Sequence, residues 1–111
     1  MEPIDRWRES LIAALREYAR IPYANGEIRN ALVCDRDGEH YLLVEEGWDG
    51  PHRIHGALIH VDIVADKLWI QHDGTERGIA DELVAAGVPR DHIVLGFRPP
   101  QARRFTDFAA A

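Results

Sequence analysis

The strongest constraint on the fold is the run His60–His72, in which two short segments of alternating apolar residues flank Ala65-Asp66. Alternation with a period of two is typical of a β-strand with one buried face. A two-residue loop at Ala65-Asp66 would pair Val64 with Lys67, and a slip of one residue would turn every side chain to the wrong face. The preferred register therefore collects on one face Ile59, Val61, Ile63, Leu68 and Ile70.

The segments around this hairpin predict an α+β fold. Apolar residues at spacings of three and four predict an amphipathic helix over residues 3–20, which ends at Ile21-Pro22 because a residue before proline avoids the α region. Asn25-Gly26 predicts a turn. Asp37-Gly38 suits a hairpin turn, and the pattern breaks again at Gly47–Pro51. We expect a four-stranded antiparallel meander over residues 27–34, 40–46, 52–63 and 67–72.

A second helix and a short apolar segment follow the meander. Asp73 and Glu76 have the spacing of a capping box, so we expect the helix to begin there, with Thr75 as an alternative N-cap. Gly87 and Pro89 mark its end. Residues 93–97 predict a buried strand or extended segment, and the tail is expected to pack through Phe105 and Phe108.

Composition narrows the classes of protein. A chain of 111 residues is typical of one domain, here 1–111. Its net charge of −6 argues against tight non-specific binding to nucleic acid, which depends on neutralising phosphates. The single cysteine, Cys34, follows an apolar run and is expected to be a small buried residue, with a reactive thiol as the alternative. We see no signal peptide and no apolar run of about 18 residues, so we expect a cytoplasmic protein without membrane contact.

The spacing His60-x-Asp62 places an imidazole and a carboxylate on one strand face. Such a pair could serve a metal site or acid–base catalysis. Regular alternation puts His72 on the opposite face, so too few ligands converge, and we expect no metal, no cofactor and no catalytic residue. Trp69 and Gln71 share the face of His60 and Asp62, and this mixture of an aromatic, an amide and charged groups suits a partner or subunit interface.

Two further features could carry function. Trp48 lies between glycines outside the expected strands, where it either covers the core or adds to the contact surface. The tail contains a basic group, Arg98, Arg103 and Arg104, which either contacts nucleic acid or faces solvent or a partner.

The chain resembles the XisI-like family, the fdxN element excision controlling factors, almost from end to end. The resemblance is carried by the following segments: Ile21-Pro22, Gly26-Glu27-Ile28, Gly47-Trp48-Asp49, His60–Ile63, Lys67–Gln71, Asp73–Glu76, Gly78-Ile79-Ala80, Gly87-Val88-Pro89 and Ile93–Phe97. It departs from the expected family pattern at Ala65-Asp66, in place of Asn-Gly or Asp-Gly, and at Arg98, in place of histidine. The first departure predicts a wider hairpin tip.

This resemblance implies a non-enzymatic accessory factor in the excision of a DNA element, where a separate recombinase performs the strand chemistry. It also implies protein–protein contact with a XisH-like partner of nuclease fold, so that DNA is engaged only indirectly. A homo-oligomer is a further expectation. Two alternatives remain: a small enzyme or metal-binding protein that uses His60 and Asp62, and a weak DNA-binding protein that uses the arginine tail.

Overall fold

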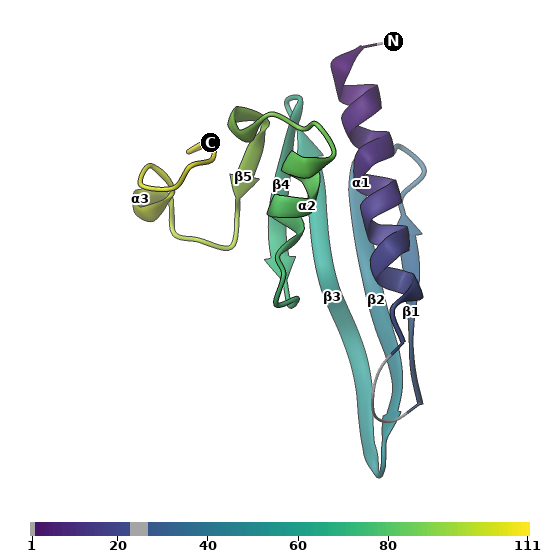
Figure 1. Cartoon of the computed structure of the whole chain (residues 1–111). Coiled ribbons are helices and arrows are strands. Elements are labelled where there is room, and N and C mark those ends of the chain that lie inside the picture. The colour runs from purple at the N-terminus through teal and green to yellow at the C-terminus, as the bar shows by residue number, and fades with distance from the viewer. Residues whose placement is uncertain (1, 23–26) are drawn as a thin grey trace.

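The computed structural model describes residues 2–22 and 27–111, and its five strands form one sheet in the order β1-β2-β3-β4-β5 (Figure 1). The strands are β1 (Glu27–Cys34), β2 (His40–Asp49), β3 (His52–Val64), β4 (Lys67–Asp73) and β5 (Ile93–Leu95). The helices are α1 (Pro3–Arg20), α2 (Ile79–Ala85), the 3₁₀ turn η1 (Arg90–His92) and α3 (Pro100–Arg103). The predicted α+β fold and its antiparallel meander are confirmed. The apolar segment forms β5, which pairs parallel to β4. The predicted turn at Asn25-Gly26 lies outside the described residues.

The register of the β3–β4 hairpin is the predicted one next to its turn. Val64 pairs with Lys67 and Val61 pairs with Ile70. Ala65 and Asp66 have φ values of 50° and 63°. Two consecutive residues with positive φ make the tight turn whose twist matches that of the strands. The expectation of a wider tip is therefore wrong: the turn keeps its two-residue form without asparagine or glycine.

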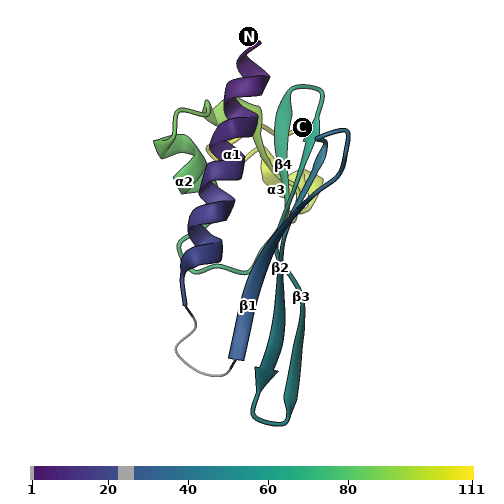
Figure 2. The same ribbon diagram turned by 90° about the vertical axis from the view of Figure 1, so that its right-hand side faces the viewer.

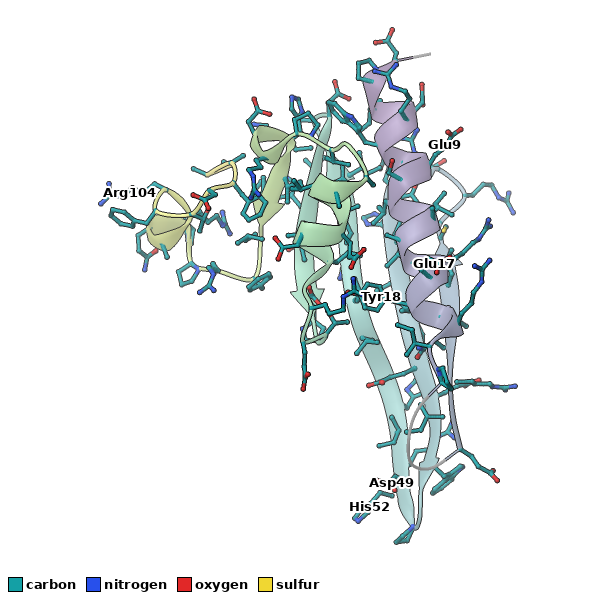
Figure 3. The ribbon with its side chains drawn as sticks, viewed as in Figure 1. Glu9, Glu17, Tyr18, Asp49, His52 and Arg104 are labelled. Atoms are coloured by element: carbon teal, nitrogen blue, oxygen red, sulfur yellow. The ribbon has the colours of Figure 1, made fainter. Side chains whose placement is uncertain are left out.

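The core lies between the sheet and the two longer helices, which cover the same face of the sheet (Figure 2). From α1 it takes Leu11, Leu15 and Tyr18, and Tyr18 points inward between α1 and the sheet (Figure 3). The remaining fully buried side chains include Tyr41, Leu43, Ile59, Val61, Leu68, Ile70, Ile79, Leu83 and Ile93. The apolar face predicted for the hairpin is thus the core face.

Helix α2 begins later than predicted. Asp73 is still in β4, and its carboxylate accepts hydrogen bonds from the backbone N–H of Thr75 (2.9 Å) and of Ile79 (2.7 Å). Asp73 therefore caps the helix across a loop, and no capping box with Glu76 forms at the start of α2. The predicted end is confirmed: Gly87 has a φ of 103°, and the N–H of Val88 donates to the carbonyl of Leu83 at 3.0 Å.

The β2–β3 hairpin is longer than predicted, because the chain breaks only at Gly50-Pro51. Glycine is needed at position 47 because the backbone of β1 passes close to it, and not because the chain turns there. A Cβ at Gly47 would lie 1.9 Å from the carbonyl oxygen of Glu27 in β1. Trp48 is thus a strand residue with 49% of its surface exposed, and the idea that it covers the core is wrong. We call residues 44–58 the outer hairpin. It contains no buried residue, and Asp49 and His52 lie at its tip (Figure 3).

Cys34 is exposed, which corrects the expectation of a buried residue. It is the last residue of β1, the edge strand, so neighbouring strands and helices shield it on few sides. Partial burial still raises the pKa of its thiol. The tail packs through Phe108, whereas Phe105 is 77% exposed. Within the described part of the chain, no helix has the length and apolar character needed to cross a membrane.

Candidate functional site

The second face of the sheet carries the candidate site. No helix covers this face over β1–β3 (Figure 2), whereas the segment after β5 packs against it at β4. Because side chains alternate along a strand, the neighbours of the core residues Tyr41, Leu43 and Val61 point to this second face. We call it the open face.

Asp62 is the centre of a polar cluster on the open face. Its Oδ1 atom lies 2.7 Å from Nδ1 of His40 and 2.7 Å from Nε2 of His60. Its Oδ2 atom accepts a hydrogen bond of 3.2 Å from the amide of Gln71. The side chain of Asp62 is only 14% exposed, while that of His40 is 57% exposed. The predicted contact between His60 and Asp62 is therefore present, and His40 and Gln71 also bond to Asp62.

Strand pairing brings these side chains together. His40 is directly opposite Asp62 across β2 and β3, and directly opposed residues have neighbouring side chains on one face. The carboxylate of Asp35 accepts hydrogen bonds of 2.8 Å from the backbone N–H groups of Glu39 and His40, which fixes the start of β2. These bonds hold the pKa of Asp35 below its usual value.

His72 does not lie where regular alternation predicts. The register shifts between His60 and Val61, so that Gln71 becomes the extra residue of a bulge and His72 is opposite His60. The expected separation of the two histidines on opposite faces is therefore wrong. His72 nevertheless stays outside the group whose ligand atoms lie within 4.8 Å of one another, which consists of His40, His60 and Asp62.

The cluster shifts the pKa values of two of its members. Burial acts to raise the pKa of Asp62, but hydrogen bonds from His40, His60 and Gln71 together lower it below the ordinary value. The hydrogen bond to Asp62 raises the pKa of His40. The carboxylate of Asp62 and the protonated imidazole of His40 therefore stabilise each other.

The segment after β5 covers the β4 end of the open face. The guanidinium of Arg103 lies 5.0 Å from the ring centroid of Trp69, and its Nε donates to the carbonyl of Arg98 at 3.0 Å. Gly96 lies so close that a Cβ there would be 2.7 Å from Oε1 of Gln71. Trp69 and Gln71 are consequently half-buried, and a partner would reach them only at their edges.

The three arginines of the tail lie over three different aromatic rings. Arg103 is turned inward over Trp69. Arg98 lies over the ring of Phe97, and Arg104 lies over the ring of Phe105 at the outer end of the C-terminal segment (Figure 3). Each guanidinium therefore already has an aromatic partner.

Trp48 belongs to a separate region of the open face. Its ring lies 5.3 Å from the guanidinium carbon of Arg53, and Glu46 beside it pairs with Arg29 at 2.9 Å. Arg53 and His60 are seven positions apart on β3, which corresponds to roughly 20 Å. The residues predicted for one interface therefore lie in two regions.

An apolar stripe connects these two regions. We call Ala31, Val33, Leu42 and Val44 the β1–β2 patch, and they alternate with the core-facing Leu32 and Leu43. Val33 is 46% exposed. The sequence signal for this patch is that Ala31–Val33 and Tyr41–Val44 are continuously apolar, a pattern typical of strands covered on both faces. Sequence reasoning missed both this signal and the role of His40.

Comparison with known proteins gives consistent results. The family described as XisI protein matches residues 1–110. A XisI-like protein from Anabaena variabilis ATCC 29413 is 36% identical, with a TM-score of 0.87 over 97% of this chain and 99% of that chain. The fdxN element excision controlling factor XisI from the same organism is 30% identical, with a TM-score of 0.82 over 99% and 100% of the two chains. No match was found among curated proteins.

Proposed function

Because the chain belongs to the XisI protein family, we propose that it is a non-enzymatic controlling factor for the excision of a DNA element and acts by binding a XisH-like protein of nuclease fold. A solved structure that is 30% identical carries the name fdxN element excision controlling factor. A controlling factor regulates a reaction that another protein performs. Protein–protein contact is therefore the expected mode of action.

The observation that carries the proposal is the β1–β2 patch on the open face. Residues 31–33 of β1 and 41–44 of β2 are apolar on both faces, yet α1 and α2 cover only one of these faces. Exposed apolar side chains that are contiguous mark sites where a protein meets a partner. The patch thus supports a contact surface that a partner covers.

Trp48 and Arg53 give this surface its second element. Tryptophan and arginine are enriched among the residues that dominate binding energy at protein interfaces. Here they stack on each other near the tip of the outer hairpin, and the pair of Arg29 and Glu46 lies between them and the patch. We expect Trp48 to insert against the XisH-like protein while the patch packs beside it.

The acidic net charge favours this indirect route to DNA. At −6, the chain repels a phosphate backbone unless basic residues gather on one surface. The tail arginines lie over three different aromatic rings, those of Phe97, Trp69 and Phe105. The partner is therefore expected to make the DNA contacts.

Co-expression of the chain with a XisH-like protein tests the proposal. We expect the two proteins to purify together, and we expect Val33→Lys and Trp48→Ala each to weaken the complex at least about tenfold. Ile21→Lys and Phe105→Ala serve as matched controls, because both residues are exposed and apolar but lie elsewhere on the surface.

The outcomes separate the competing ideas. A monomer that binds no XisH-like protein would contradict the proposal. A homodimer that Val33→Lys dissociates would assign the patch to a second copy of the chain. A shift of duplex DNA by the chain alone, with affinity that falls steeply with salt, would support the alternative of direct DNA binding.

A further inference from the structure

The polar cluster on the open face has the composition of a metal site. Nδ1 of His40, Nε2 of His60 and a carboxylate oxygen of Asp62 all lie within 4.8 Å of one another. Imidazole nitrogens and a carboxylate oxygen are ligands that Zn²⁺ accepts. We propose that His40, His60 and Asp62 bind one divalent transition-metal ion of the zinc type, with water in the remaining position.

The strand geometry supplies a site that is largely formed in advance. His60 and Asp62 are two residues apart on β3 and so point to the same face. His40 enters from the directly opposite position on β2. Ligands on paired strands are held more precisely than ligands on loops.

The ligand atoms need to move only slightly to form a coordination sphere. The two nitrogens are now 2.7 Å from Oδ1 of Asp62, which is a hydrogen-bond distance. Ligands about 2.0 Å from a tetrahedral ion are about 3.3 Å apart. His40 is exposed, so rotation about its side-chain bonds opens this space without movement of the backbone. The ion then replaces the protons that the nitrogens share with the carboxylate.

Gln71 prepares the carboxylate for this role. Its amide donates to Oδ2 of Asp62, which leaves Oδ1 facing the two histidines. Hydrogen bonds of this kind orient metal ligands and restrict their motion. Gly96, which directly follows β5, lies close to Gln71 and limits its movement. The segment after β5 therefore supports the residue that orients Asp62.

The ligand set selects the kind of metal. Two nitrogens and one oxygen suit zinc, cobalt, nickel or copper, whereas Mg²⁺ and Ca²⁺ require mostly oxygen ligands. Because His40 is more than half exposed, the remaining position faces solvent. This inference does not depend on the proposed partner, since binding of the ion is measured on the chain alone.

Isothermal titration of the EDTA-treated full chain with zinc chloride tests the inference. We expect one ion per chain and no comparable binding of magnesium chloride. Loss of a hydrogen bond to a metal ligand typically costs 10–100-fold in affinity, so loss of a ligand itself, in His40→Ala or His60→Ala, should cost at least tenfold. With cobalt as the probe, we expect the absorption bands of a four- or five-coordinate ion.

His55→Ala is the matched control. His55 is an exposed histidine of the same strand and lies outside the ligand group, so its loss should leave zinc affinity unchanged. The inference is overturned if the intact chain binds no zinc, or if His55→Ala weakens binding as much as His40→Ala. His40→Ala is the decisive variant because this residue is exposed and its replacement leaves the core intact, which circular dichroism verifies.

Discussion

The turn at Ala65-Asp66 makes a quantitative prediction about stability. Ala65 has a φ of 50°, a conformation that costs an L-residue with a Cβ roughly 1–2 kcal/mol. Glycine adopts it without that cost but loses about 0.5–1 kcal/mol more in conformational entropy on folding. The difference predicts that Ala65→Gly stabilises the protein by about 0.5–1 kcal/mol.

Urea denaturation measures this change as a shift in the free energy of unfolding. Thermal unfolding should show it as a rise of about 2–4 °C in Tm, since 1 kcal/mol corresponds to about 4 °C in a domain of this size. Ala13→Gly is the matched control, because Ala13 is an exposed residue in the middle of α1. There the same substitution should destabilise by about 1 kcal/mol.

The opposite signs of the two substitutions make the test sharp. Both replace an exposed alanine by glycine, and they differ in the φ value that the backbone imposes. If Ala65→Gly destabilises the protein as Ala13→Gly does, Ala65 does not have a positive φ in solution. The two-residue register of the β3–β4 hairpin, on which the geometry of the polar cluster depends, would then be refuted.

Three further predictions concern the cluster, the core and the thiol. Because the pKa of His40 is raised in the folded protein, its bond to Asp62 contributes its full stabilisation below pH about 6.5, the pKa of histidine in the unfolded chain, and this stabilisation is lost as the pH rises through the folded pKa. Because the pKa of Asp62 is lowered, its contribution is present above pH about 3.9, the pKa of aspartate in the unfolded chain, and is lost as the pH falls through the folded pKa. In metal-free protein, the deficit in unfolding free energy caused by His40→Gln should therefore be larger at pH 5.5 than at pH 8.5, as urea titrations at both values would show; an equal deficit would contradict this pairing. Leu43→Ala removes a fully buried side chain between sheet and helix and should cost about 3–5 kcal/mol in urea denaturation, whereas a cost below 1 kcal/mol would place Leu43 outside the core. Cys34 should react with a thiol reagent in the native protein, more slowly than in urea because its pKa is raised, and protection until unfolding would mean that it is buried.

Local patterns predicted most of the fold because each records one physical preference. Alternation between His60 and His72 indicated both the strands and the register, since only one pairing buries all the apolar residues together. The end of α2 was predictable because glycine there adopts a positive φ that other residues avoid. These features depend on neighbours in sequence, so the sequence alone contains them.

The errors arose where a distant segment decides the structure. Gly47 looked like a break in β2, but its role is to admit the backbone of β1, twenty residues earlier in the sequence. Asp73 looked like the start of a helix, yet it remains in β4 and bonds to Ile79 across a loop. Cys34 looked buried because its neighbours are apolar, but strand order places β1 at the edge.

The candidate site was only half predictable for the same reason. His60 and Asp62 are two residues apart, so alternation alone places them together. His40 joins them through pairing of β2 with β3, and the bulge that moves His72 has no local signal. A search for polar residues opposite Asp62 in the preceding strand would have found His40, once the strand register was known.

The outer hairpin also has a kinetic consequence. Both faces of residues 44–58 lack buried side chains, and strand pairing shifts at its base, between Leu43 and Val44. Amide protons along β2 should therefore exchange with solvent progressively faster from Leu43 toward Asp49, through openings far smaller than global unfolding. We expect the base to act as a hinge, so that Trp48 changes direction while the helices and the polar cluster remain in place. Binding at the outer hairpin would then be read as slowed exchange there, before any change reaches the core.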